Sequence, residues 1–146
     1  MTFVHATCVG LRRGRGWVGV LLRGPSGAGK SDLALRLIES GARLIADDQT
    51  HLARTGRALI ATAPPALAGL LEVRGVGIVR LPSAQRLARA PLALLVDLVA
   101  AERVERLPEL AQESVLGVAL PVVALAAFEA SAPAKLRLAL QRAAVA

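Results

Sequence analysis

The most informative pattern along the chain is a series of short apolar runs separated by glycine, proline or charged residues. Trp17–Arg23 (WVGVLLR) and Leu92–Val99 (LALLVDLV) are almost continuously apolar, which is typical of strands buried on both faces of a sheet. Leu116–Leu125 has the same character, and Phe3–Cys8 and Arg43–Ala46 are shorter runs of strand-like composition. These runs predict the strands of a central sheet.

Two segments have the pattern of helices. Ser31–Ser40 is rich in strong helix formers and is followed by Gly41, a residue type that often ends a helix. Near the end of the chain, Ser131 precedes Ala132 and Pro133, the order expected for a cap and the first turn of a helix. We therefore expect helices between predicted strands.

The remaining segments predict turns and hairpins. Gly10–Gly16 (GLRRGRG) is a basic, glycine-rich stretch that we expect to form a turn. His51–Ala61 predicts a hairpin around Thr55 and Gly56, Pro64–Leu70 a short helical or irregular piece, and Glu72–Leu81 a strand broken by a loop. Together the pattern predicts a single α/β domain over residues 1–146, with a mixed central sheet, flanking helices and an added hairpin.

Composition restricts the class of protein. In 146 residues the hydrophobic share is 54% but aromatics are only 2%, so the core is aliphatic and disorder is excluded. The apolar run Val115–Phe128 is too short for a membrane span and contains Gly117 and Pro121. Met1–Gly10 lacks the pattern of a secretory signal, and a single cysteine, Cys8, fits a reducing compartment. We expect a cytoplasmic protein without a membrane partner.

The net charge is +7, and nearly all the positive side chains are arginines. Such a composition indicates either solvated arginine faces or attraction to an anionic partner such as a nucleotide or an acidic protein. Nucleic acid is not an expected partner, because binders of single strands need aromatic stacking platforms. This chain has only Phe3, Trp17 and Phe128.

The strongest motif follows the predicted strand Trp17–Arg23. It satisfies G-x-x-x-x-G-K-[ST], whose glycines let backbone N–H groups surround phosphates while the following helix adds its positive end. In this pattern Lys30 reaches the β- and γ-phosphates of a nucleotide, and the Ser31 hydroxyl ligates Mg²⁺. The expected nucleotide-binding residues are Gly24, Pro25, Ser26, Gly27, Ala28, Gly29, Lys30 and Ser31.

Two acidic positions compete for the chemistry beside this phosphate loop. Asp97 follows an apolar run, as the aspartate that assists Mg²⁺ does in many phosphate-loop enzymes. Asp47 and Asp48 end the next predicted strand after the loop helix. Adjacent side chains on a strand point to opposite sides, so only one of this pair can face the phosphates unless the backbone bends.

Several stretches together resemble one family, the bacterial HPr kinase/phosphorylases, in their catalytic domain. Gly24–Asp48 is similar to the family's phosphate loop, helix and strand ending in Asp-Asp, and Leu71–Ile78 (LEVRGVGI) to its signature segment. His5 resembles the family's histidine ahead of the loop. ERLPE around Arg106 and LGVALP at Leu116–Pro121 occur in the expected order.

The resemblance implies an ATP- and Mg²⁺-dependent protein serine kinase that phosphorylates HPr, a phosphocarrier of the bacterial phosphotransferase system. It implies that the phosphate loop and Lys30 hold ATP, and that Ser31 and Glu72 bind Mg²⁺. It also implies a homo-oligomer, since the full-length family forms hexamers through this domain.

The same resemblance implies the catalytic roles. Asp48 is the expected general base that takes the proton of the substrate serine, with Asp47 supporting it and His5 tuning the pair. Arg74 belongs to the signature loop, and Arg106 is the expected catalytic arginine, although the neighbouring Arg103 competes with it.

The sequence also departs from the family pattern. The usual N-terminal domain is not expected, because Met1 lies just before His5, as in the short forms of alphaproteobacteria. The family's Pro-Val-Arg-Pro-Gly-Arg-Asn segment, linked to removing the phosphate, should follow LGVALP. The chain instead reads VVALAAFEASAPAKLRL. The resemblance therefore supports the kinase reaction and not the phosphorylase reaction.

Two alternatives stay open at this point. A small-molecule kinase would use Asp97 as its Mg²⁺ aspartate and Arg80–Arg89 as an arginine-rich lid. A nucleotide-sensing module would bind ATP with little catalysis.

Overall fold

The computed structural model describes residues 2–145 as a sheet of nine strands, a separate hairpin and two α-helices. The strands are β1 (Thr2–Val4), β2 (Ala6–Arg13), β3 (Gly16–Arg23), β4 (Arg43–Ala46), β5 (Thr50–Thr55), β6 (Ala58–Thr62), β7 (Leu70–Val73), β8 (Gly77–Arg80), β9 (Arg89–Leu98), β10 (Ala111–Val115) and β11 (Val118–Leu125). The helices are α1 (Lys30–Glu39) and α2 (Ala132–Val145), with 3₁₀ turns at Pro65–Leu67, Ser83–Gln85 and Ala101–Arg103. The predicted α/β fold is confirmed.

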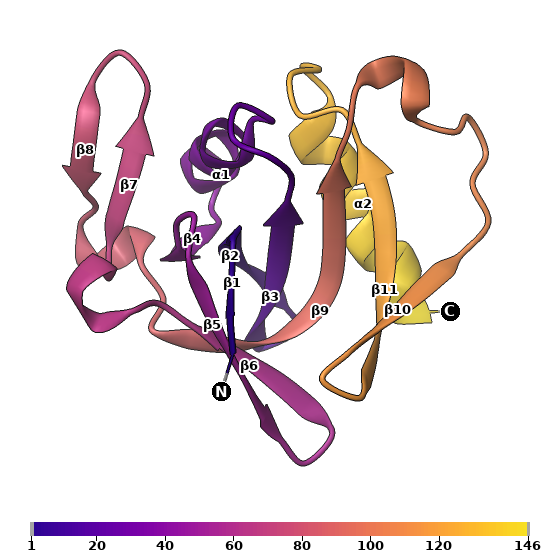
Figure 1. The fold of residues 1–146 in the computed structure, drawn as a ribbon, viewed down its shortest axis with the longest axis horizontal. Coiled ribbons are helices and arrows are strands. Elements are labelled where there is room, and N and C mark those ends of the chain that lie inside the picture. Colours follow the sequence, from indigo (N-terminus) through magenta and orange to yellow (C-terminus); the bar gives the residue numbers. More distant parts are fainter. Residues whose placement is uncertain (1, 146) are drawn as a thin grey trace.

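The centre of the sheet sets the direction of every strand that carries the site. Strand β3 runs parallel to β9, which runs parallel to β11, while β2 lies antiparallel to both β3 and β4. The carboxyl ends of β4, β3, β9 and β11 and the amino end of β2 therefore meet at one edge, drawn at the top of Figure 1. Ligands of α/β proteins bind at such an edge.

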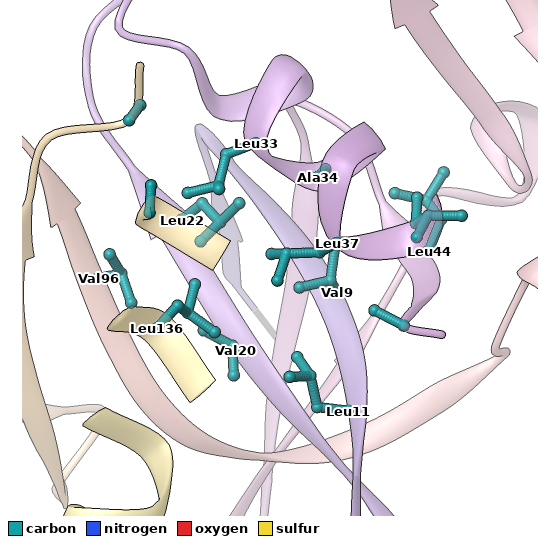
Figure 2. Close-up of a cluster of buried hydrophobic side chains, with 14 of the residues drawn as sticks. Val9, Leu11, Val20, Leu22, Leu33, Ala34, Leu37, Leu44, Val96 and Leu136 are labelled. Atoms are coloured by element: carbon teal, nitrogen blue, oxygen red, sulfur yellow. The ribbon is translucent and has the colours of Figure 1, made fainter. Parts of the chain in front are cut away.

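Both helices cover the same face of this sheet. Leu33 and Leu37 of α1 and Leu136 of α2 are fully buried in one cluster with Val20 and Leu22 of β3, as Figure 2 shows. The apolar side chains of α1 recur every three or four residues, so one stripe of the helix faces the strands. The helices thereby fix the orientation of the segments that lead into them.

The opposite face is covered by strands rather than helices. The sheet curls because β6 pairs with the first residues of β9, and the order continues through β5 to β1. Leu52 of β5 and Leu59 of β6 are fully buried in a second cluster with Leu21 of β3 and Leu95 of β9. Strand β3 thus has buried side chains on both faces, as its continuous apolar run predicts.

The structure corrects three expectations. The predicted turn at Gly10–Gly16 is mostly strand, because β2 continues to Arg13 opposite Gly16 and only the residues between them turn. Strand β10 was not predicted, since AQESV is polar and exposed and becomes a strand only by pairing with β11. His51, expected on the surface, is half-buried against the Phe3 ring, and its Nε2 is buried without a hydrogen-bond partner.

The predicted break within Glu72–Leu81 is confirmed as the hairpin β7–β8, which stands apart from the main sheet (Figure 1). Val76 and Ile78 near its tip are 75% and 73% exposed. Its base is held by Leu71, which is fully buried in the helix-side core. Leu71 thereby anchors the hairpin to the core, while the tip of the hairpin is exposed to solvent.

Within residues 2–145, neither helix has the length and apolar character that crossing a lipid bilayer requires.

We predict that Leu116→Asn stabilises the protein. Leu116 and Gly117 close the β10–β11 hairpin with φ of 49° and 80°, the left-handed region that a two-residue hairpin turn needs. A leucine there is strained, whereas asparagine adopts this conformation more readily, so the free energy of unfolding should rise by about 0.5–1 kcal/mol. Urea unfolding followed by fluorescence of Trp17, the chain's only tryptophan, measures it. Leu116→Ala also removes the leucine side chain but lacks the polar group with which asparagine bonds locally in this conformation, so an equal gain from it would contradict this explanation.

Candidate functional site

The phosphate loop connects the centre of the sheet to the first helix. It leaves β3 after Arg23, and α1 begins at Lys30, so the first N–H groups of the helix point toward the loop. Gly27 and Gly29 have φ of 84° and 98°, values that other residues rarely adopt. The Ala28 N–H donates to the Pro25 carbonyl at 3.0 Å and closes the turn. The loop has the backbone form that surrounds a phosphate.

Lys30 lies folded over this loop. Its Nζ donates to the Gly24 carbonyl at 2.6 Å and to the Pro25 carbonyl at 3.2 Å, and the residue is only 8% exposed. The ammonium group is therefore held at the loop by the loop's own carbonyls.

Asp47, at the end of β4, connects three separate segments. Its Oδ1 accepts hydrogen bonds from the Ser31 hydroxyl at 2.7 Å and the Thr7 hydroxyl at 3.0 Å. Its Oδ2 accepts from the Glu72 N–H at 3.0 Å. One carboxylate thus joins the phosphate-loop serine, strand β2 and the β7–β8 hairpin.

Asp48 takes a different direction because the backbone bends at this residue. Its φ is 63°, in the left-handed region, and its N–H donates to the Thr7 hydroxyl at 3.1 Å. With this bend Asp48 lines the same cavity as Lys30 and Ser31, while Asp47 bonds to Ser31 itself. Both members of the pair therefore reach the loop.

The cavity beside the loop has a volume of about 310 Å³. Its walls come from the phosphate loop, the first turns of α1, Asp48 and the β7–β8 hairpin, which contributes Glu72, Val73 and Arg74. The structure thus brings together most of the sequence-predicted site residues: Ser26, Gly27, Gly29, Lys30, Ser31, Asp48, Glu72 and Arg74. The roles of these residues stay predictions.

His5, Arg103 and Arg106 do not line this cavity. His5 is exposed and follows Val4, whose partner in β5 is Thr50, so it lies at the same edge as the aspartates. Both arginines are exposed in the segment that follows β9. Their assignment as catalytic residues stays a prediction.

Asp97 has a structural partner instead of a place in the cavity. Arg23 Nε and Nη2 donate to the two Asp97 carboxylate oxygens at 2.7 and 3.1 Å, and Nη2 also donates to Glu113 at 2.8 Å. The hydrogen bonds from Arg23 hold the pKa of Glu113 below its usual range. The three side chains join β3, β9 and β10 across the sheet edge.

The arginine-rich segment Arg80–Arg89 also lies away from the cavity. The Leu87 N–H donates to the Leu44 carbonyl at 2.9 Å, and Arg86 forms a bridge with the same residue of β4. The segment is therefore attached to the sheet and does not form the lid expected for a small-molecule kinase.

The donor set around Ser31 has the chemistry of a magnesium site. Ser31, Asp47 and Glu72 supply hydroxyl and carboxylate oxygens, the ligands that Mg²⁺ prefers. Among residues 2–145, no group of three histidine, cysteine or acidic residues is gathered closely enough to hold a metal alone. Mg²⁺ in kinases is held by one or two carboxylates together with substrate phosphates, and Asp47 and Glu72 are two carboxylates that could take this part.

Besides the cavity-lining Asp32, Leu35 and Val73, which adjoin predicted site residues or lie on α1, Thr7 and Phe128 belong to the site and were not predicted. Thr7 is fully buried and contacts both aspartates, but it carries no motif, and only the pairing of β2 with β4 brings it there. Phe128 lines the cavity from the turn after β11, more than ninety residues along the chain from the loop. In the sequence, the only signal for Phe128 is its position at the end of an apolar run.

The chain matches the family model described as HPr Serine kinase C-terminal domain over residues 2–136. It is 44% identical over 80 residues to an HPr kinase/phosphorylase of Exiguobacterium sp., covering 54% of this chain and 24% of that protein. It is 52% identical over 63 residues to an HPr kinase/phosphorylase of Limosilactobacillus reuteri, covering 42% of this chain and 20% of that protein. The matched stretches are thus a quarter or less of these relatives' length.

The fold is shared with a solved structure, the Hpr(Ser) kinase/phosphatase from Coxiella burnetii. The TM-score is 0.86 over 99% of this chain and 92% of that chain, at 23% sequence identity. The core architecture is therefore the same while most side chains differ.

We predict that Thr7→Val destabilises the fold by about 0.5–1.5 kcal/mol, because valine keeps the shape but removes the hydroxyl that bonds to the part-buried N–H of Asp48 and to the Asp47 carboxylate. The free energy of unfolding in urea measures the loss. Thr7→Ser is the matched control, since it keeps the hydroxyl and loses only a methyl group. If the valine variant were as stable as the serine variant, the hydroxyl would not hold the aspartate pair.

Proposed function

The chain belongs to the family of HPr serine kinase C-terminal domains, and from this premise we propose that it transfers the γ-phosphate of ATP to a serine hydroxyl of an HPr-like phosphocarrier. The observation that carries the proposal is the placement of Asp48 in one cavity with the phosphate loop, while Asp47 accepts the Ser31 hydroxyl at 2.7 Å. Asp48 would thereby act on the acceptor hydroxyl, while Asp47 would act on the metal ion beside Ser31.

We propose that ATP binds with its phosphates in the loop of residues 24–31. The backbone N–H groups and Lys30 would surround the β- and γ-phosphates, and Lys30 would exchange its bonds to Gly24 and Pro25 for bonds to phosphate oxygens. Ser31, Asp47 and Glu72 are the residues that would hold Mg²⁺. When bound, Mg²⁺ neutralises charge on the phosphates.

Asp48 is proposed as the general base. Asp47 is engaged by three donors, whereas the Asp48 carboxylate faces the cavity in which an acceptor hydroxyl would lie. The proton of the substrate serine passes to an Asp48 carboxylate oxygen as the serine oxygen bonds to the γ-phosphorus. The bond from that phosphorus to the bridging oxygen breaks, and ADP leaves.

The proposal also includes roles for Arg74, His5 and Arg106. Arg74 can reach the phosphates from the hairpin tip, since it lines the cavity. His5 and Arg106 would act only if their exposed segments approach the bound substrates. The exposed apolar residues Val76, Ile78 and Leu107 offer surface for assembly into the proposed homo-oligomer.

We expect Asp48→Asn to lower phosphate transfer to HPr by about 10²- to 10⁴-fold, because the amide cannot take the serine proton. The measurement is phosphoserine formation on HPr with ATP and Mg²⁺, together with the Kd for ATP, which should stay unchanged. Asp97→Asn is the control, because that carboxylate lies outside the cavity and pairs with Arg23.

Two outcomes would contradict this assignment. Transfer that survives in Asp48→Asn and disappears in Asp97→Asn would move the chemistry to the other aspartate, as in a small-molecule kinase. Tight ATP binding by the unaltered protein without labelling of any HPr would indicate a nucleotide sensor.

We further expect Asp47→Asn to weaken ATP binding about ten- to a hundredfold in the presence of Mg²⁺ and to change it little in EDTA. The reason is that the Asn side chain loses the charge that would hold the metal while it can still accept a hydrogen bond from Ser31. Calorimetric titration with and without Mg²⁺ measures both affinities. Equal losses of ATP affinity with Mg²⁺ and in EDTA would mean that Asp47 supports the structure of the loop and does not bind the metal.

A further inference from the structure

Phe128 is an aromatic side chain held in solvent beside the phosphate loop. It is 70% exposed, although the two residues before it, Ala126 and Ala127, are 6% and 3% exposed. A phenylalanine in this position gains nothing from core packing, and the chain has only two phenylalanines. Its ring is therefore available to a ligand of the cavity that it lines.

The backbone on both sides of Phe128 is fixed to the helix that follows the phosphate loop. The Arg36 guanidinium, on α1, donates to the Ala127 carbonyl and, at 3.1 Å, to the Glu129 carbonyl. Arg36 is itself oriented by a salt bridge to Asp32 at 2.9 Å, one turn earlier on the helix. The position of the Phe128 Cα is thus set relative to the loop.

The ring lies directly against the loop backbone. A Cβ built on Gly29 would lie 3.0 Å from Phe128 Cζ and 3.1 Å from Cε1. Gly29 therefore lacks a side chain for a second reason besides its φ, because the Ala127 Cβ, at 2.7 Å, and the Phe128 ring already occupy the space. Phe128 lines the same cavity as Gly29 and Lys30.

The strand order places Phe128 and the aspartates Asp47 and Asp48 on opposite sides of the phosphate loop. At the carboxyl edge the strand order is β11, β9, β3, β2 and β4, so the phosphate loop after β3 lies between Phe128 after β11 and Asp47 and Asp48 after β4 (Figure 1). A nucleotide whose γ-phosphate faces Asp48 extends its nucleoside end away from the aspartates. That direction leads toward Phe128.

We propose that Phe128 is the stacking platform for the purine base of the nucleotide, an inference that rests on the proposed ATP binding. A flat, apolar and exposed ring on a fixed backbone matches the face of a base, which gains from aromatic stacking. The residue positions the base and thereby favours ATP over ligands that carry only phosphates. It takes no part in proton or phosphoryl transfer.

The test compares ATP with inorganic triphosphate, which has the phosphates and no base. In calorimetric titrations with Mg²⁺, Phe128→Ala should raise the Kd for ATP about tenfold and leave the Kd for triphosphate unchanged. Phe128→Trp should keep the affinity for ATP. Phe3→Ala is the matched control, since Phe3 is the other phenylalanine, is 59% exposed and lies on β1 outside the cavity.

Other outcomes overturn the inference in distinguishable ways. Equal weakening of ATP and triphosphate by Phe128→Ala would mean that the ring supports the loop and not the base. Unchanged affinity for both ligands would place the base elsewhere. If the unaltered protein bound neither ligand, the proposed function would fail together with this inference.

Discussion

The hydrogen bond from the Ser31 hydroxyl to Asp47 is the contact on which the rest of the site depends. It joins the first turn of α1 to the end of β4, and the same carboxylate binds Thr7 of β2 and the Glu72 N–H of the hairpin. A carboxylate satisfied by three donors is held in one orientation. The loop, the sheet edge and the hairpin are therefore positioned around a single charged group.

This arrangement gives two neighbouring aspartates different environments. The left-handed backbone at Asp48 turns its side chain into the cavity, a conformation that aspartate adopts more readily than most residues with a Cβ. The N–H bond from Asp48 to Thr7 helps to maintain this conformation. An uncommon backbone conformation at a cavity wall is typical of residues placed for function, and here it directs one carboxylate to Ser31 and the other to the cavity.

The edge of the sheet also sets the order of the residues along the cavity. Because β3, β4, β9 and β11 all end there, the acids, the phosphate loop and Phe128 lie in sequence across it. The salt bridges of Arg23 to Asp97 and Glu113 join the strands behind the loop, so Asp97 serves the scaffold. Binding, proton transfer and base recognition would thus use different strands of one sheet.

The amino-acid sequence by itself determined the elements whose signals are local. Gly24–Ser31 specifies its loop because glycine spacing and the Lys-Ser pair act within eight residues, and the apolar runs predict β3, β9 and β11, of which β11 is only partly buried. Asp47, Asp48 and Glu72 were predicted through their resemblance to one family. Only the tertiary structure decided which aspartate bonds to Ser31, that Asp97 pairs with Arg23, and that Thr7 and Phe128 belong to the site. These contacts join residues that are far apart in the chain. They form only through strand pairing and backbone bends, which no local sequence pattern specifies.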